Sequence, residues 1–230
     1  MTNTQYFLIR RLHSLLGVIP LGVFLFAHMT TNSMAFFGQE AFDHKVDLIH
    51  SLGPLLPFVE AAMIFVPLAL HIIIGIVIAQ TGVSNTSDLG YARNWAYTLQ
   101  RWTGWAAVAF IVYHAFSLRI LDVAGGRENF FAYMSYLFRF SPVWPVWLAV
   151  YLLGGVAVIY HFANGLCTFC MTWGITVGPK SQKVMAGIAA ATAVLLLSML
   201  IGSMIGFYIN APAEAAAMGS AIQANVPAAH

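Results

Sequence analysis

Residues 141–176, SPVWPVWLAVYLLGGVAVIYHFANGLCTFCMTWGIT, place one histidine deep inside an apolar run. The run is long enough to cross a membrane as a helix, because about 20 apolar residues at 1.5 Å each span a hydrocarbon core of about 30 Å. A neutral imidazole in hydrocarbon costs free energy unless a partner binds it. His161 is therefore a candidate site residue, and its partner must lie elsewhere in the chain.

The composition of the whole chain agrees with a membrane location. Of its 230 residues, 60% are hydrophobic and 8% are charged, which is far from the usage of soluble domains. A formal net charge of +2 gives no indication of a nucleic-acid partner. Cys167 and Cys170 form a C-x-x-C, but Met171 stands where a c-type haem attachment requires histidine. We interpret the two cysteines as small apolar residues of a helix.

Five apolar stretches have the length of transmembrane helices, and runs this long exclude barrel strands. They cover approximately residues 12–37, 55–80, 96–121, 143–172 and 184–209. The sequence therefore predicts an all-α membrane protein, a five-transmembrane-helix bundle formed by residues 1–210. The Ala-rich tail, residues 211–230, is expected to be poorly ordered.

The positions of lysine and arginine predict the orientation of the chain. Six fall on one side of the predicted spans and four on the other, so the richer side is expected in the cytoplasm. The protein is then a multi-pass protein of the inner (cytoplasmic) membrane, with its N-terminus in the cytoplasm and its C-terminus outside. The six are Arg10, Arg11, Arg93, Arg101, Lys180 and Lys183, and the four are Lys45, Arg119, Arg127 and Arg139.

One histidine lies on each of the first four predicted helices, at residues 28, 71, 114 and 161. They lie 16, 16, 12 and 18 residues from the apolar entries Leu12, Leu55, Trp102 and Val143 respectively. At 1.5 Å per residue this is roughly 18 to 27 Å, past the midplane of the membrane. Because successive helices alternate in direction, His71 and His161 are expected in the inner half, and His28 and His114 in the outer half.

Two pairs of histidines at matched depths predict two bis-imidazole b haems, with each iron held between rings from two helices. Gly75 and Gly165 each follow an inner histidine by four residues, so bare backbone lies one turn away on the same face. Two alternatives remain: four unrelated core histidines bonded to carbonyls, or a zinc site, which would want its ligands at one depth. The other histidines are interpreted as solvated residues of helix ends, a loop and the tail: His13, His44, His50 and His230.

Several segments closely resemble the cytochrome b subunit of bacterial succinate:menaquinone oxidoreductases. They are RRLHSLLGVIPLGVF (10–24), FVEAAMIFVPLALHIIIG (58–75), RNWAYTLQRWTG (93–104), YHFANGL (160–166) and TWGITVGPKSQ (172–182). The resemblance covers about residues 5–185.

This resemblance implies a five-helix membrane anchor of a succinate dehydrogenase or fumarate reductase (respiratory complex II). The anchor would hold two b haems, the inner one bound by His71 and His161 and the outer one by His28 and His114. The implied partners are a flavoprotein subunit, which carries the dicarboxylate site, and an iron–sulfur subunit on the cytoplasmic face. Electrons would pass through the haems between the iron–sulfur subunit and menaquinone. Two other classes are kept open: a dihaem cytochrome b anchor of a hydrogenase or nitrate reductase type, and a non-redox membrane protein.

Two further sites are expected near the ends of the helices. Glu60 is a candidate proton-handling group of an outer quinone site, because it precedes His71 by eleven residues, close to three turns of a continuous α-helix. Its alternative role is to complement the positive end of its helix. Arg11, His13 and Ser14 cluster at one helix start, and are expected to contact a soluble partner subunit or the propionates of the inner haem. Plain positive-inside anchoring is the alternative for the basic residues.

Overall fold

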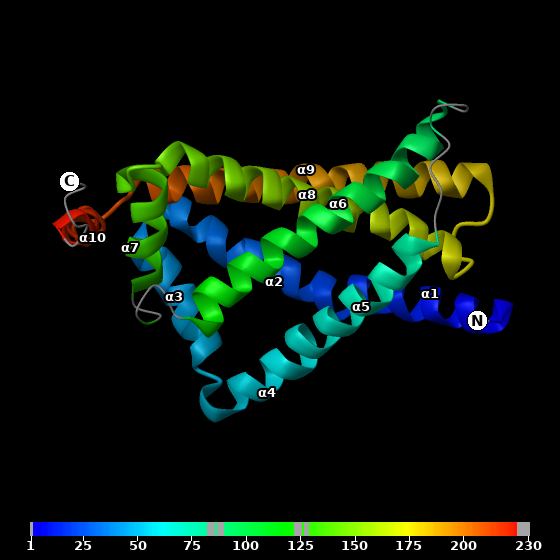
Figure 1. The fold of residues 1–230 in the computed structure, drawn as a ribbon, viewed down its shortest axis with the longest axis horizontal. Coiled ribbons are helices and arrows are strands. Elements are labelled where there is room, and N and C mark those ends of the chain that lie inside the picture. The colour runs from blue at the N-terminus through cyan, green and yellow to red at the C-terminus, as the bar shows by residue number, and fades with distance from the viewer. Residues whose placement is uncertain (1, 82–85, 87–89, 122–125, 127–128, 225–230) are drawn as a thin grey trace, which may run out of the picture. The chain divides into compact units, whose positions relative to one another are not determined.

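The structure, a computed structural model, describes residues 2–81, 86, 90–121, 126 and 129–224, and the regular secondary structure of these residues is entirely helical (Figure 1). This confirms the predicted all-α membrane protein. Labels α mark α-helices, η1 and η2 mark 3-10 helices, and η3, η4 and η6 mark π-helices. In chain order the elements are α1 Asn3–Val18, α2 Pro20–Ser33, η1 Met34–Phe37, α3 Gln39–His50, η2 Gly53–Leu55, α4 Leu56–Glu60, η3 Ala61–Phe65, α5 Val66–Gln80, α6 Ala92–Ala115, η4 Phe116–Ile120, α7 Phe130–Ser135, η6 Tyr136–Phe140, α8 Trp144–Thr172, α9 Pro179–Ile209 and α10 Ala213–Ala224.

The chain divides into two compact units, which we describe separately. Unit 1 comprises Met1–Ala27, Gly53–Ala109 and Gly155–Leu197. Unit 2 comprises His28–Leu52, Phe110–Gly154 and Ser198–His230. Each unit is therefore assembled from three separate segments of the chain.

Four helical stretches are long and apolar enough to cross a membrane. They are Asn3–Phe37, Gly53–Gln80, Trp144–Thr172 and Pro179–Ile209, and they correspond to the first, second, fourth and fifth predicted spans. The third predicted span lies on α6, whose 24 residues would give a helix of about 36 Å. Polar side chains in its first half, including Arg93, Gln100 and Arg101, make this helix less apolar than the other four.

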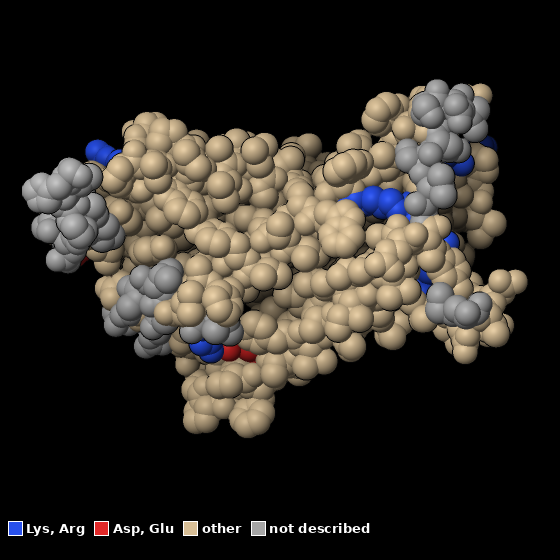
Figure 2. All heavy atoms as spheres, viewed as in Figure 1, with Lys and Arg blue, Asp and Glu red and all other residues tan. Residues whose placement is uncertain are grey.

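Few charged side chains appear on the face drawn in Figure 2. Large apolar side chains are widely exposed, among them Phe58 at 73%, Val194 at 67% and Val23 at 61%. Apolar exposure on this scale is rare on soluble monomers and is typical of surfaces that contact lipid or other proteins. The observed surface therefore agrees with the predicted bilayer location.

Prolines explain two interruptions of the membrane helices. Pro20 has no N–H and its ring clashes with the preceding turn, so α1 ends at Val18 and α2 begins at Pro20. The π-helix η3 immediately precedes the α5 turn that contains Pro67. A π-turn is one of the ways in which a helix absorbs such a clash. Where α8 ends, Gly174 adopts φ +72°, a left-handed conformation that favours glycine.

In unit 1, α1 packs along α5, and the two lie side by side in Figure 1. The start of α1 is fixed by a capping box, in which Thr2 Oγ1 accepts from the Gln5 N–H and the Gln5 side chain accepts from the Thr2 N–H. Near the same end of α5, the hydroxyls of Tyr6 and Thr81 are 3.1 Å apart. The α1–α5 contact therefore extends from the helix ends to the histidines described below.

Unit 2 has an aromatic core. Phe131, Phe138 and Phe207 are each no more than 2% exposed, and Phe207 contacts both of the others and Phe42. Asn210 Nδ2 donates to the carbonyl of Ala35 at 2.9 Å, which attaches the end of α9 to η1. Through these rings the core packs α3, which follows the helix of His28, with α7 and η6, which follow the helix of His114.

The Ala-rich tail contains a helix where the sequence predicted poor order. Residues Ala213–Ala224 form α10, which contacts α7 and η6 in unit 2 (Figure 1). Alanine has the highest intrinsic helix propensity, which accounts for a helix in this segment. The remaining tail, residues 225–230, lies outside the described residues.

Candidate functional site: two histidine pairs

The two predicted inner histidines come together in unit 1. His71 lies on α5 and His161 on α8, and their ring centroids are 6.1 Å apart with an interplanar angle of 89°. Both side chains are half-buried. Two imidazoles from separate helices thus face a common space within one compact unit.

His71 is held by α1 through a reciprocal pair of hydrogen bonds. Its Nδ1 lies 2.9 Å from the carbonyl oxygen of His13, and Nδ1 of His13 lies 3.0 Å from the carbonyl oxygen of His71. Since a carbonyl only accepts, each ring donates its Nδ1–H. The rings also stack, with centroids 3.8 Å apart and planes 14° from parallel. With its Nδ1 occupied as a donor, His71 keeps Nε2 as the nitrogen with a free lone pair.

His161 is held by α6 in the same way. Its Nδ1–H donates to the carbonyl of Gln100 at 3.1 Å, and Nε2 of Gln100 donates to the carbonyl of His161 at 3.0 Å. The amide oxygen of Gln100 accepts from Asn164 Nδ2 at 2.8 Å, which fixes the direction of the glutamine amide. His161 therefore also presents Nε2 as its free lone pair.

Glycines create the space for these contacts. A Cβ on Gly17 would lie 2.5 Å from His71 Cε1, and a Cβ on Gly75 would lie 2.9 Å from His13 Cε1. On the other helix pair, a Cβ on Gly104 would lie 3.1 Å from His161 Cε1. The close approach of the helices thus depends on the missing side chains.

The two predicted outer histidines come together in unit 2. His28 lies on α2 and His114 on α6, with ring centroids 5.8 Å apart and an interplanar angle of 80°. Asn32 Nδ2 is 3.3 Å from Nε2 of His28 and donates to the His28 carbonyl at 2.8 Å. His114 stacks on Phe110 at 5.6 Å and meets Tyr151 edge to face at 5.7 Å.

The geometry of both pairs fits a metal ion held between two imidazoles. A metal–imidazole bond of about 2 Å on each side, plus roughly 1 Å from each nitrogen to its ring centre, separates two centroids by about 6 Å. The outer pair gives a second sign: Nδ1 of His114 is buried and has no hydrogen-bond partner among the described residues. Leaving such an atom unsatisfied costs about 1–3 kcal/mol. The donor sets therefore fit bis-histidine ligation in both units, whereas the face of Gly75 is covered by the His13 ring and is not free for a flat macrocycle.

A zinc site of the usual kind is not supported. Within the described ranges, no three or more His, Cys, Asp or Glu side chains gather closely enough to hold a metal ion. Structural and catalytic zinc sites use three or four such protein ligands. Two ligands from the protein instead match a metal whose other positions are filled by a porphyrin.

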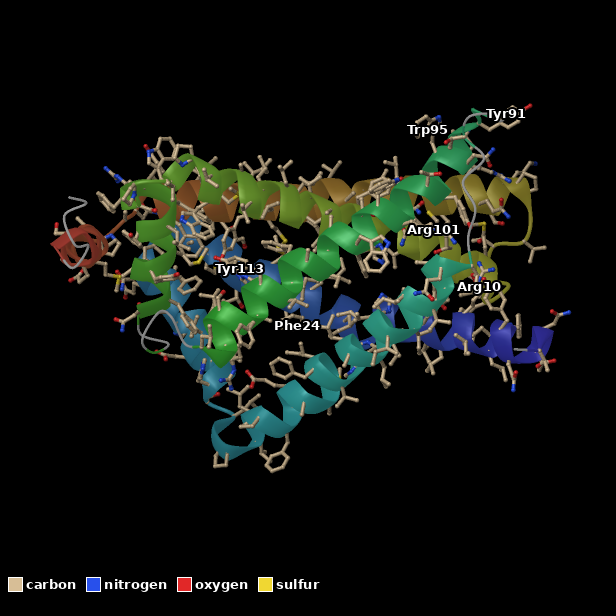
Figure 3. The ribbon with its side chains drawn as sticks, viewed as in Figure 1. Arg10, Phe24, Tyr91, Trp95, Arg101 and Tyr113 are labelled. Carbon is tan, nitrogen blue, oxygen red and sulfur yellow. The ribbon has the colours of Figure 1, made fainter. Side chains whose placement is uncertain are left out.

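The charged residues of the predicted cytoplasmic side fall together. All six of its lysines and arginines belong to unit 1, whereas Lys45, Arg119 and Arg139 of the other side belong to unit 2 and Arg127 lies outside the described residues. Arg11 lies between two rings, 4.4 Å from the centre of Phe7 and 4.9 Å from that of Trp173, whose Nε1–H donates to Ser14 Oγ at 3.2 Å. Figure 3 labels Arg101 on α6, and its guanidinium lies 4.0 Å from the centre of the Tyr97 ring.

The connector that carries α3 is acidic. One face of this helix exposes Gln39, Glu40, Asp43, His44 and Asp47 around an open surface hollow. Partial burial and the nearby Asp47 carboxylate raise the pKa of Asp43, while a hydrogen bond from Gln39 lowers it. His44 is exposed, as predicted, and His50 Nδ1 donates to the carbonyl of Val46 at 2.9 Å.

A π-helix separates Glu60 from the α-helix that carries His71. Glu60 is half-buried and ends α4, and the π-helix η3 then occupies the next five residues before α5 and His71. A π-turn adds about one residue to the turn, which rotates the following helix by roughly 100° relative to a continuous α-helix. Glu60 and His71 therefore do not share one helix face, although a spacing of eleven residues predicted that they would.

Sequence reasoning missed two residues of the inner site. His13 was interpreted as a solvated helix-end histidine, yet it is half-buried and stacked on His71, and Gln100 was not singled out. A signal was present, because His13 and Gln100 are each followed by glycine after four residues, as His71 and His161 are. Because Nδ1–H of His13 donates to the His71 carbonyl, this nitrogen is not free to contact a partner subunit or a haem propionate.

The sequence of the chain is similar to those of known proteins. The family model "Succinate dehydrogenase/Fumarate reductase transmembrane subunit" matches residues 80–202. The succinate dehydrogenase cytochrome b558 subunit of Bacillus subtilis (strain 168) is 40% identical to the chain over 184 residues, which cover 80% of this chain and 88% of that protein. Both matches include the segments that carry His114 and His161.

Proposed function

The chain belongs to the family of succinate dehydrogenase/fumarate reductase transmembrane subunits, and from this premise we propose that it carries electrons through two bis-histidine b haems. As a succinate dehydrogenase cytochrome b subunit it is the membrane part of an enzyme complex, and the dicarboxylate site belongs to another subunit. The electrons pass between a cytoplasmic iron–sulfur subunit and menaquinone. His71 and His161 bind the inner haem, and His28 and His114 bind the outer haem.

One observation carries this proposal: each predicted histidine pair falls within one compact unit. The pairs have ring centroids 6.1 Å and 5.8 Å apart and interplanar angles of 89° and 80°. Unrelated core histidines would have no reason to meet two by two at a separation that suits a metal ion. The proposal therefore rests on side-chain geometry as well as on family membership.

The residues of the chain would do three things at these sites. The Nε2 atoms of His71 and His161 would bind the metal, while their Nδ1–H groups, held by backbone carbonyls, would fix the orientation of both rings. Haem iron supplies the one-electron redox chemistry. The apolar helices around the rings would exclude water, which affects the redox potential of a bound haem.

The distribution of charge supports the proposed orientation and partner. Unit 1 contains all six lysines and arginines of the predicted cytoplasmic side. The flavoprotein and iron–sulfur subunits would dock at that side, near the cluster formed by Arg11, Ser14 and Trp173. The N-terminus is then cytoplasmic and the C-terminus lies outside, in a five-span arrangement in which α6 is the third span.

Glu60 remains the proposed proton-handling group of a quinone site. Its support is now its position: a half-buried carboxylate in an apolar stretch, directly before a π-turn, a feature often found at functional sites. General acid–base groups contribute about 10²- to 10⁴-fold to a rate. Glu60→Gln should therefore preserve haem content and succinate–dye activity while lowering menaquinone-linked turnover by about a hundredfold or more. An unchanged quinone-linked rate would leave Glu60 without a catalytic role.

The proposed function is tested by purifying the complex and measuring its composition and spectrum. We expect two b haems per chain, a reduced-minus-oxidised spectrum typical of b cytochromes, and co-purifying flavoprotein and iron–sulfur subunits. A chain without haem would support the alternative of a non-redox membrane protein. Haem together with subunits of a hydrogenase or nitrate reductase would support the alternative of a dihaem anchor of such an enzyme.

A further inference from the structure

One spacing recurs on four helices of unit 1: a histidine or glutamine followed four residues later by glycine. The four instances are His13 and Gly17 on α1, His71 and Gly75 on α5, Gln100 and Gly104 on α6, and His161 and Gly165 on α8. The structure pairs them as α1 with α5 and α6 with α8. We propose that His13 and Gln100 are equivalent positioning residues, which hold the ligand rings of His71 and His161 respectively. This inference rests on the proposed function, because it assumes that these two rings bind the inner haem.

The first support is the shared pattern of hydrogen bonds. In each pair the ligand ring donates Nδ1–H to the backbone carbonyl of the positioning residue, at 2.9 Å for His71 and 3.1 Å for His161. The side chain of the positioning residue donates back to the carbonyl of the ligand residue, at 3.0 Å in both pairs. A rotation or slide of either helix would weaken both bonds at once. The crossing therefore fixes the ring more firmly than one bond could.

The second support is steric. The glycine of each positioning helix lies against the ligand ring, since a Cβ on Gly17 or Gly104 would meet Cε1 of His71 or His161 at 2.5 Å or 3.1 Å. The same turn of helix thus supplies a carbonyl acceptor, a side-chain donor and a bare surface. Small residues alone would show only close packing, whereas here they coincide with the reciprocal bonds.

His13 is a positioning residue and not an additional ligand. Its ring is nearly parallel to that of His71, 14° between planes at 3.8 Å, and its Nδ1 is occupied by the His71 carbonyl. Two stacked rings cannot place a metal ion between their nitrogens along a common axis. Gln100, which occupies the equivalent position on α6, has an amide and cannot act as a haem ligand in a pair with His161.

The two positions also predict which substitution should be tolerated. Glutamine already performs the task at position 100, so glutamine at position 13 should restore the donor to the His71 carbonyl. It would lack the aromatic face that stacks on His71. Alanine would remove both the donor and the stacked ring while leaving the backbone carbonyl of residue 13 in place.

The test compares His13→Ala, His13→Gln and Gln100→Ala with a control, His50→Ala, in the purified complex. Haem per chain, redox titration and the low-spin EPR signals are measured, because a residue that only packs the helices would not shift one midpoint potential alone. We expect His13→Ala and Gln100→Ala each to lower retention of the inner haem by about tenfold, the lower end for lost ligand-orienting partners. They should also shift the inner midpoint potential and its EPR signal, with the outer haem unchanged.

The rescue variant decides between positioning and ligation. His13→Gln should restore inner haem content to near the level of the unaltered protein, with a smaller shift of potential than His13→Ala. Complete loss of the inner haem in both His13 variants would make His13 a ligand and overturn the inference. Full haem content with unchanged potentials in His13→Ala and Gln100→Ala would equally overturn it. If the unaltered complex holds no haem, the proposed function fails, which is a distinct result.

Discussion

The two histidine pairs are similar in spacing and different in how their rings are held. In unit 1, both Nδ1 atoms donate to carbonyls of a neighbouring helix, and glycines give the rings clearance. In unit 2, Nδ1 of His114 is buried without a hydrogen-bond partner in the described part of the chain, and the ring rests against Phe110 and Tyr151. The orientation of the two rings in unit 1 is thus set by hydrogen bonds to carbonyls, whereas that of the His114 ring is set by aromatic packing.

This difference predicts different responses to substitution. Hydrogen bonds between helices fail when the helices are pushed apart, so the inner site should be sensitive to added volume at the crossings. Packing against rings fails when those rings move, so the outer site should be sensitive to changes around Phe110. Each perturbation should affect one haem and spare the other.

The largest effect is expected from Gly17→Ala. The new Cβ would lie 2.5 Å from Cε1 of His71, so α1 and α5 must separate and both reciprocal bonds lengthen. Overpacking of this kind costs typically 1–3 kcal/mol. We expect loss of most of the inner haem with the outer haem retained, measured by haem quantitation and redox titration.

Gly187→Ala on α9 is the control, since an added Cβ there would meet no heavy atom within 4 Å. It should keep both haems. Equal loss of inner haem in the Gly17 and Gly187 variants would show that clearance at the His71 ring does not govern the site.

A smaller effect, on the other haem, is expected from Gly154→Ala. The added Cβ would overlap the ring of Phe110, which stacks on His114 at 5.6 Å. Phe110 can relieve the overlap by moving, so we expect partial loss or a shifted spectrum of the outer haem. Low-temperature difference spectra of the purified complex would measure it. A change confined to the inner haem would contradict the assignment of His114 to the outer site.

The smallest effect is expected from Trp173→Phe, which removes the Nε1–H donor to Ser14 but keeps an aromatic ring beside Arg11. Losing one such hydrogen bond costs about 0.5–1.5 kcal/mol. Neither haem should change, while the thermal stability of the complex in detergent should fall slightly. Trp102→Phe is the control, because Trp102 is 70% exposed. A lost haem in the Trp173 variant would mean that this cluster belongs to the inner site itself.

The sequence predicts the helical fold and the depth of each histidine in the membrane, because both depend on local pattern. Apolar runs of about 20 residues specify membrane helices, and the alternating direction of these helices converts sequence position into depth. That reasoning places His71 with His161 and His28 with His114, and the structure brings the same residues together. Helix α6 shows the limit of apolarity as a signal, since it carries His114 yet is less apolar than the other long helices.

What the sequence analysis missed depends on contacts between helices or on local interruptions. The bonds of His13 and Gln100 join residues 58 and 61 positions apart, so no window of sequence contains them. The π-turn after Glu60 changes the phase of the helix, and Pro67 was the only local warning. Helix α10 lies in a tail without an apolar pattern, and the helix propensity of alanine is the local signal that favours it.

The most direct test of two separate haem sites is a set of single and double histidine substitutions, assayed by redox titration of haem in isolated membranes. Membranes report on the chain even if a variant does not assemble with the soluble subunits. His71→Ala and His161→Ala should each remove the same redox component, and their double variant should remove no more than either alone. His28→Ala and His114→Ala should remove the other component. A variant at His71 that retains both components unchanged, or loss of the same component in His71→Ala and His114→Ala, would contradict the account.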